Sequence, residues 1–228
     1  MKRQVVLAIT GASGVTYAIR LAEVLLAAAC DVHLTISSAG ATVLREELDM
    51  QVDLENFQPS MLLLDRGPDS DDAKLRIIRS LAGVSSESSN VLDVSTGEPG
   101  EIIYHHYKRL TASIASGSFL THGMVICPCS MATLAAIVHG TGTNLIHRAA
   151  EVHMKERRPL ILVPRETPLS VVHLENMTRA AKAGAIVMPA MPGFYHGVTG
   201  VRDLVDFVVA RIADQLGIEN ALIRRWGS

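Results

Sequence analysis

Apolar residues gather in short runs that are separated by longer stretches of mixed character. The runs cover residues 4–9, 32–36, 124–127, 160–163 and 185–188. Runs of this length, rich in Val, Ile and Leu, are typical of strands buried on both faces of a parallel sheet. We therefore predict five strands, most of them followed by a loop that carries polar or small residues.

Segments with a helical pattern lie between these strands. They cover residues 15–29, 39–48, 74–81, an apolar segment that runs through Val138, and residues 144–158, 169–183 and 201–216. Pro159 and Gly184 follow two of them at positions where helices end. Alternating strands and helices predict an α/β fold. We expect a single Rossmann-like or flavodoxin-like three-layer domain with a mostly parallel sheet.

The length and composition favour one domain over residues 1–228. Of these residues 48% are hydrophobic but only 4% are aromatic, so the core must consist mainly of Ala, Val, Leu and Ile. Residues 59–100 contain few apolar side chains and many turn-forming residues. Because such a stretch cannot bury a core of its own, we interpret it as a surface excursion within the domain.

Charge and cysteine content exclude several classes of protein. The formal net charge is −2, which gives no basic field for nucleic acid or an anionic membrane surface. No apolar run reaches the ~18 residues of a membrane span. Cys30, Cys127 and Cys129 form neither a disulfide framework nor a zinc-ligand pattern. The nine histidines match no metal motif either. We expect a cytoplasmic protein without a metal site.

Two Gly- and Ser-containing loops follow the first two predicted strands. Residues 11–14 read Gly-Ala-Ser-Gly and precede a helix, a layout that points backbone N–H groups at a phosphate or another anion. The glycine pattern of a dinucleotide site is incomplete. Ser37-Ser38 stands where an NAD site needs an acidic residue, which argues against NAD and leaves room for a mononucleotide. Alternatively, Ser13 and Ser37 only cap the helices that follow.

Two further small-residue segments surround the strand at residues 124–127. Residues 128–133 follow this strand, and Ser130 and Thr133 have the spacing of a helix N-cap. The same hydroxyls could bind a ligand at the helix N-terminus. Before the strand, residues 111–119 carry small side chains, which would let a flat ligand or another subunit approach the backbone.

A cationic helix and an Arg-Glu pair flank the strand at residues 160–163. Arg148 and Lys155 are seven residues apart and so share one helix face. Arg165 and Glu166 follow the strand, at the edge where ligands bind in parallel α/β folds. The arrangement predicts an anion site with a carboxylate beside it. The alternative is a solvated helix face and an ordinary loop pair.

Three more residues near the C-terminus are candidates for ligand contacts. Tyr195 lies in a loop rich in Pro and Gly after the last predicted strand, and could offer a hydroxyl or simply pack in the loop. Arg211 interrupts an apolar helix face, where a surface position with a buried stem is the simpler explanation. Trp226, the only Trp, is expected to pack against its own chain or a neighbour.

Taken in order, these motifs resemble the UbiX family of flavin prenyltransferases, within the wider group of FMN-binding, cysteine-decarboxylase-like flavoproteins. The residues that carry the resemblance are 11–14, 116–119, 128–133, 148–152, 155–158, 165–169 and 192–195. The set spans nearly the whole chain except residues 59–100.

The resemblance implies transfer of a dimethylallyl group from dimethylallyl phosphate to N5 and C6 of reduced FMN without a metal. The prenylated FMN would then serve a UbiD-type decarboxylase that acts on aromatic acids, as in ubiquinone biosynthesis. The FMN contacts it implies are Gly11, Ala12, Ser13, Ser37, Ser130, Met131, Ala132, Thr133 and Arg165. The implied prenyl-phosphate site comprises Arg148, Lys155, Tyr195 and Arg211, with Trp226 as a wall of the pocket. The implied catalytic residues are Glu166, Ser13, Lys155 and Arg148.

Elementary chemistry agrees with these roles. Expelling phosphate without a divalent ion needs fixed cations, and Arg binds phosphate in a bidentate manner. Glu166 could relay a proton at N5 of the flavin. Family members also form trimer-based shells, often dodecamers, so a homo-oligomer is expected.

Two alternatives stay open at this point. One is an FMN-dependent oxidative decarboxylase of a cysteine-containing substrate. That branch of the superfamily has a His upstream of the loop matching residues 128–133, where this chain has Ala115-Ser116-Gly117. The other is a non-catalytic FMN carrier or accessory subunit. Residues 59–100 are longer than in compact family members and have no implied role.

Overall fold

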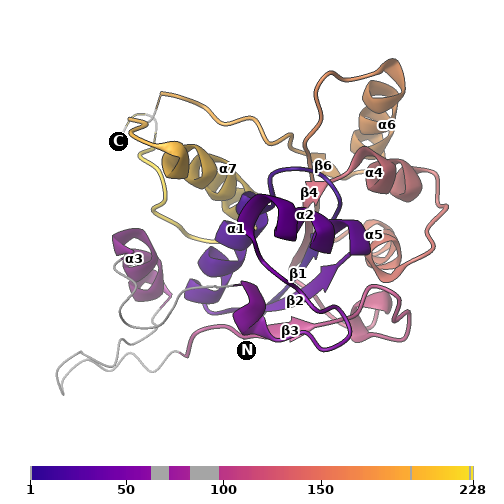
Figure 1. Ribbon diagram of the computed structural model, residues 1–228, viewed down its shortest axis with the longest axis horizontal. Coiled ribbons are helices and arrows are strands. Elements are labelled where there is room, and N and C mark those ends of the chain that lie inside the picture. The colour runs from indigo at the N-terminus through magenta and orange to yellow at the C-terminus, as the bar shows by residue number, and fades with distance from the viewer. Residues whose placement is uncertain (1, 63–71, 83–97, 196, 226, 228) are drawn as a thin grey trace.

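A parallel sheet forms the centre of the molecule (Figure 1). The computed structural model describes residues 2–62, 72–82, 98–195, 197–225 and 227. Within them the strands are β1 (Arg3–Ile9), β2 (Cys30–Ile36), β3 (Ile102–Tyr104), β4 (Gly123–Cys129), β5 (Leu160–Pro164) and β6 (Ile186–Val187). Neighbouring strands pair in parallel in the order β3-β2-β1-β4-β5-β6.

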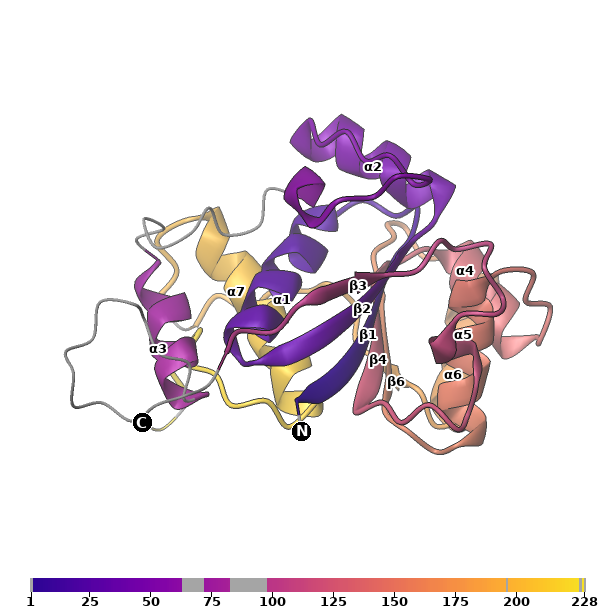
Figure 2. The ribbon, with the colours of Figure 1, turned by 90° about the horizontal axis from the view of Figure 1, so that it is seen from below.

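Helices cover both faces of the sheet and make three layers (Figure 2). The helices are α1 (Val15–Ala27), α2 (Ser38–Leu48), α3 (Ala73–Leu81), α4 (Met131–Val138), α5 (Leu145–Lys155), α6 (Val171–Lys182) and α7 (Val201–Gln215). Helices α1 and α7 lie on one face, with α3 outside them, and α4, α5 and α6 lie on the other. Among the described residues, no helix combines the length and apolar character that crossing a bilayer requires.

The core consists of two apolar clusters, one on each face of the sheet. In β1 the side chains alternate between them: Val5 and Leu7 belong to the cluster under α1 and α7, and Val6 and Ala8 to the cluster under α4 and α5. Both sets are fully buried, because successive side chains of a strand point to opposite faces. Burial on both faces explains why the strand runs read as continuously apolar.

The predicted fold class is confirmed, and the structure adds one strand. The five predicted strands and the seven predicted helices all form, with ends that differ by a few residues. Strand β3 was not predicted. It is only three residues long, and its residues are half-buried at the edge of the sheet, so no apolar run marks it.

The described part of the excursion at residues 59–100 contributes to the core. Leu75 and Ile78 of α3 are buried in the cluster under α1 and α7. An ionic network holds α3 there: Arg20 of α1 contacts Asp206 of α7 and Asp72, the N-cap of α3, each at 2.7 Å. Residues 63–71 and 83–97 of the excursion lie outside the described residues.

The strand order has its switch point between β1 and β4. The chain leaves β1 through α1 on one face of the sheet and leaves β4 through α4 on the other face. In doubly wound sheets, ligands bind at such a switch point, beyond the carboxyl ends of the strands. The candidate residues predicted from the sequence follow β1, β2, β4 and β5, which are neighbours in this sheet.

Candidate active site

The backbone N–H groups at the end of the loop between β1 and α1 bind a carboxylate of the protein itself. Gly14 is the N-cap of α1, has a φ of 100°, and makes no side-chain cap bond. The Glu47 carboxylate accepts the N–H groups of Gly14 at 2.9 Å and of Val15 at 3.1 Å. The alternative that Ser13 caps this helix is therefore wrong. The predicted anion-binding geometry is present, and a carboxylate from the last turn of α2 occupies it.

Glu47 is a candidate site residue that the sequence did not reveal. Its contact with Gly14 joins residues 33 positions apart. No local motif marks it, because the position of the carboxylate depends on how the end of α2 folds over the β1–α1 loop. The two residues whose N–H groups it accepts, Gly14 and Val15, directly follow Ser13 in the sequence.

Close packing joins the β1–α1 loop to the loop after β2. A Cβ atom on Gly11 would lie 2.5 Å from the Cβ of Ala39, so only glycine fits there. Ser37 caps α2 by accepting the N–H of Gly40 at 2.9 Å, which confirms the capping interpretation. The Ser37 N–H donates to the carbonyl of Ile9 at 3.0 Å and fixes this loop to the end of β1. The Ser37 hydroxyl keeps its own hydrogen for a ligand.

Ser130 and Thr133 form a hydroxyl pair at the N-terminus of α4. The Ser130 Oγ accepts the Thr133 N–H at 3.2 Å and lies 2.9 Å from the Thr133 Oγ1. Met131 and Ala132 are the first two residues of α4, and N–H groups at these positions have no acceptor within a helix. Two hydroxyls and the N–H groups of the first turn give this end of α4 the kinds of donor that bind anions at helix N-termini.

Arg165 bridges from β5 to the β1–α1 loop. Its Nε donates to the carbonyl oxygen of Ser13 at 3.2 Å. Because β4 lies between β1 and β5 in the sheet, this side chain passes the carboxyl end of β4. Glu166 is exposed, and its Oε1 accepts the N–H of Thr167 at 3.1 Å. Arg165 and Glu166 line a cavity of about 90 Å³ together with Pro164, Thr167, Leu169, Met177, Pro189, Ala190 and Met191.

Arg211 lines a second cavity beside the first, and Tyr195 packs against a residue of that second cavity. This second cavity, of about 310 Å³, contains Arg211 and Phe207 and shares Pro189 and Met191 with the first. The Tyr195 ring meets Phe207 edge-on, with 5.6 Å between ring centroids, and 60% of the residue is exposed. Arg211 is paired with Asp214 at 2.9 Å. Trp226 lies outside the described residues.

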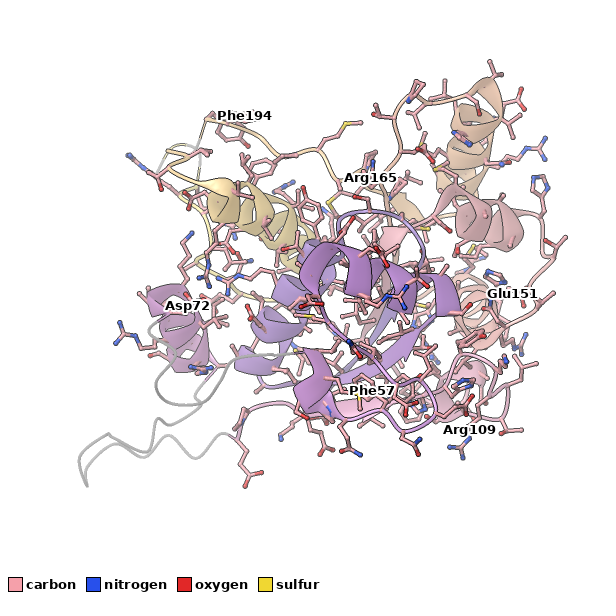
Figure 3. All side chains as sticks on the ribbon, in the orientation of Figure 1. Phe57, Asp72, Arg109, Glu151, Arg165 and Phe194 are labelled. Carbon is pink, nitrogen blue, oxygen red and sulfur yellow. The ribbon has the colours of Figure 1, made fainter. Side chains whose placement is uncertain are left out.

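The structure does not place Arg148 and Lys155 beside Arg165 of the same chain. The Arg148 Nε donates to the carbonyl of Ala115 at 3.2 Å, and Lys155 is paired with Glu156. Lys155 ends α5 shortly before β5 begins, whereas Arg165 follows the other end of β5, a strand of five residues or roughly 16 Å. Figure 3 shows Arg165 beside the β1–α1 loop and Glu151, the partner of Arg148, away from it on α5.

The cysteines behind the site are not equipped for nucleophilic chemistry. Cys127 and Cys129 are fully buried in β4. Burial raises the pKa of both thiols, and that of Cys129 to about 12. A thiol is a nucleophile only as its thiolate, so these residues serve as packing at neutral pH.

Comparison with known proteins places this arrangement in a family. The sequence model of the Flavoprotein family matches residues 1–213. Flavin prenyltransferase UbiX of Halalkalibacterium halodurans is 43% identical over 219 residues, which cover 96% of this chain and 91% of that protein. The chain belongs to the UbiX family of flavin prenyltransferases. The resemblance predicted from the motifs is thereby confirmed.

Structures of UbiX-family proteins share the fold over the full length. AnUbiX (PadA1), determined in complex with FMN and dimethylallyl pyrophosphate, is 32% identical with a TM-score of 0.76, and the alignment covers 100% of this chain and 99% of that one. The dodecameric FMN-dependent UbiX-like decarboxylase of Escherichia coli O157:H7 is 32% identical with a TM-score of 0.74, covering 99% and 100%. The core elements that present the candidate site are therefore those of the family.

Proposed function

We propose that this chain transfers a dimethylallyl group from dimethylallyl phosphate to N5 and C6 of reduced FMN. The observation that carries the proposal is the continuous row of candidate residues along four neighbouring strand ends. Ser37, Gly11 to Ser13, Ser130 to Thr133 and Arg165 follow β2, β1, β4 and β5 in spatial order. Glu166 in the first cavity and Arg211 in the adjoining one continue this row, with Tyr195 packed against Phe207 of the second cavity.

The donor groups along the row fit FMN. Glu47 already occupies the N-terminal N–H groups of α1, so the FMN phosphate is directed to the N-terminus of α4. Ser130 and Thr133 offer hydroxyls there beside the backbone donors of Met131 and Ala132. Gly11 lets the backbone of its loop pack closely against α2. Arg165, whose Nε contacts the Ser13 carbonyl oxygen, and the Ser13 hydroxyl would then contact the flavin.

The cationic residues bind and orient the prenyl phosphate. Reduced FMN would supply the nucleophilic atoms: N5 takes the carbon whose C–O bond breaks, and the electron pair leaves with the phosphate. The bond to C6 would form as the alkene takes up a proton and C6 loses one. Fixed guanidinium and ammonium groups stabilise the charge that develops on the phosphate, which a divalent ion would otherwise neutralise. Arg211 fits this role because its cavity adjoins the one lined by Arg165 and Glu166. Glu166 holds the proton that leaves or joins N5.

A second copy of the chain completes the site. Lys155 lies at the end of α5 that is remote from the Arg165 cavity of its own chain, and Arg148 contacts Ala115 and Glu151 instead, so we infer that both act in the site of a neighbour. Met191 (66%), which lines the cavity, is exposed, and so are Val171 (71%) and Val172 (62%), which follow Leu169 of the cavity along the chain, and Phe194 (72%), which follows Met191. Such a surface is typical of an interface. We therefore propose a trimer-based homo-oligomer, a dodecamer in its full form.

The product is proposed to serve a separate enzyme. Prenylated FMN would pass to a UbiD-type decarboxylase that acts on aromatic acids. The described cysteines are all free and buried, which agrees with the proposed cytoplasmic location.

The function is tested by incubating the pure protein anaerobically with reduced FMN and dimethylallyl phosphate, followed by mass spectrometry of the extracted flavin. The expected result is a flavin carrying one added prenyl group. Product must also form with a chelator present, since the cations are fixed side chains. Parallel reactions with the pyrophosphate identify the preferred donor. An unchanged flavin mass with both donors would refute prenyl transfer.

A matched variant tests the role of Glu166. Glu166→Gln removes the charge but keeps the size and the hydrogen-bond acceptor of the side chain. It should bind FMN as the wild type does and form the adduct far more slowly. Normal turnover in this variant would remove Glu166 from the mechanism.

A further inference from the structure

We propose that Thr10 is a positioning residue that holds the β4–α4 loop in register with the β1–α1 loop and thereby sets the affinity for the FMN phosphate. The inference rests on the proposed function in one respect, the use of FMN. Thr10 is not among the residues that the motifs or the resemblance marked as ligand contacts.

The side chain of Thr10 makes two hydrogen bonds across the switch point between β1 and β4. Its Oγ1 donates to the carbonyl oxygen of Pro128 at 2.8 Å and accepts the N–H of Ser130 at 2.8 Å. Its own N–H points to the same Pro128 carbonyl at 3.3 Å. Only 1% of Thr10 is exposed, so water cannot replace these partners. A hydroxyl can donate and accept at once, which no aliphatic side chain can.

On the side of β1, the regular ladder does not extend to this part of β4. The ladder between β1 and β4 runs from the Val5–Gly123 pair to the Ala8–Ile126 pair and stops there. On the other side, the pairing of β4 with β5 shifts in register between Ile126 and Cys129. The last residues of β4 therefore lack regular ladder bonds on the side of β1. Thr10 supplies the missing bonds at that point.

Ser130 carries this constraint to the N-terminus of α4. The Ser130 N–H donates to the Thr10 Oγ1, and the Ser130 side chain caps α4 and contacts Thr133. A shift of Ser130 would move both hydroxyls and the first N–H groups of α4 together. The carbonyl of Ile9, the residue before Thr10, accepts the backbone N–H of Ser37. The end of β1 is thus the common reference for the loops on both sides of it.

The experiment compares FMN and riboflavin, which differ only by the phosphate. Thr10→Val keeps the shape and removes the hydroxyl, leaving the Ser130 N–H without its partner. We expect the Kd for FMN to rise about ten-fold, because a buried donor is left unsatisfied. The Kd for riboflavin should change by less than about two-fold. Both constants are measured by quenching of flavin fluorescence, with Tm recorded for each variant.

Two variants serve as controls. Thr10→Ser restores the hydroxyl and should recover FMN affinity to within about two-fold of the wild type. Thr35→Val makes the same chemical change at a fully buried Thr of β2 whose Oγ1 has no hydrogen-bond partner among the described residues. It should leave both affinities unchanged. If Thr10→Val does not fold, Thr10→Cys, with a weakly bonding thiol, takes its place with a smaller selective loss.

The outcomes separate this proposal from the function itself. Wild-type affinity for FMN in Thr10→Val, or an equal loss of FMN and riboflavin, would overturn the positioning role. A wild-type protein that binds FMN but forms no prenyl adduct would overturn prenyl transfer and leave the role of Thr10 intact.

Discussion

The carboxylate of Glu47 lies 2.9 Å from the backbone nitrogen of Gly14 and thus places a negative charge at the N-terminus of α1. Gly14 makes no side-chain cap bond of its own, so the end of α2 provides the cap for α1. This contact fixes the β1–α1 loop, on which Ser13 lies, from the side opposite to Arg165.

Replacing Glu47 by Ala should therefore destabilise the fold. We expect the free energy of unfolding to fall by ~1 kcal/mol, the usual cost of losing an N-cap together with its charge. Urea unfolding at neutral pH measures this loss. Glu46→Ala is the matched control, because the neighbouring Glu46 contacts only Arg45 at the surface and should matter little. Equal stability of the two variants would contradict the capping role.

A buried histidine pair predicts a second effect on stability. The His33 Nδ1 lies 2.9 Å from the His105 Nε2, and the His33 Nε2 lies 2.7 Å from the Gln4 Oε1. The Gln4 amide nitrogen donates to Asp31, so the Gln4 oxygen accepts from His33, and His33 in turn accepts from His105. The His33 ring is therefore neutral. Burial, together with the nearby His33 and Arg109, lowers the pKa of His105 to about 4.

The sign of the pH effect follows from this pKa. Between pH 6.5 and about 4, His105 is protonated in the unfolded chain but neutral in the folded one. The unfolded state binds more protons there, so stability falls as the pH drops through this window. The loss should total on the order of 3 kcal/mol and end near pH 4. His105→Gln keeps a donor toward His33 and does not titrate, so its stability profile should be flatter. An unchanged profile would contradict the assignment.

How much of this could be predicted from the sequence depends on the range of the interactions. The strands β1, β2, β4 and β5 were found because burial on both faces requires continuous apolar runs. Strand β3 was missed because Ile102–Tyr104 is short, half-buried and pairs only with β2. Strand β6 was predicted as four residues but only Ile186–Val187 pair with β5.

The range of the interactions also decides which residues of the candidate site could be predicted. Ser37, Ser130 and Arg165 were identified because each directly follows a predicted strand, and the strand-end rule needs no knowledge of distant contacts. Glu47 and Thr10 were missed because their roles depend on partners 33 and 118 or more residues away. The face shared by Arg148 and Lys155 was evident from helix spacing, but which cavity they serve depends on how copies assemble.

Asp72 gives a prediction for the acid range. Burial raises its pKa, but the hydrogen bond and charge of Arg20 and the charge of Arg202 outweigh this, so the pKa is held below its ordinary 3.8. Its contribution is therefore present above pH 3.8 and is lost as the pH falls through the lower folded value.

Asp72→Asn isolates that contribution, because Asn still caps α3. We expect the variant to lose ~1–3 kcal/mol at pH 7, because the buried Arg20 loses the charge of one carboxylate partner while keeping Glu23 and Asp206. Its stability should also depend less on pH below 4 than that of the wild type. Chemical denaturation at a series of pH values measures both. Since the His105 effect ends near pH 4, the two windows can be separated in one data set.

Subunit mixing tests whether Lys155 and Glu166 act in one site from two chains. Lys155→Met and Glu166→Gln should each abolish or strongly slow adduct formation when assembled alone. In oligomers coexpressed from equal amounts of both variants, some sites combine an intact Glu166 from one copy with an intact Lys155 from its neighbour. Random assortment makes this about a quarter of the sites, and activity should recover to that level. Lys155→Met mixed with Arg148→Met is the control: both residues lie on α5, every site receives them from the same copy, and no activity should return. Failure of the first mixture to recover would mean that Lys155 serves its own chain or no site at all.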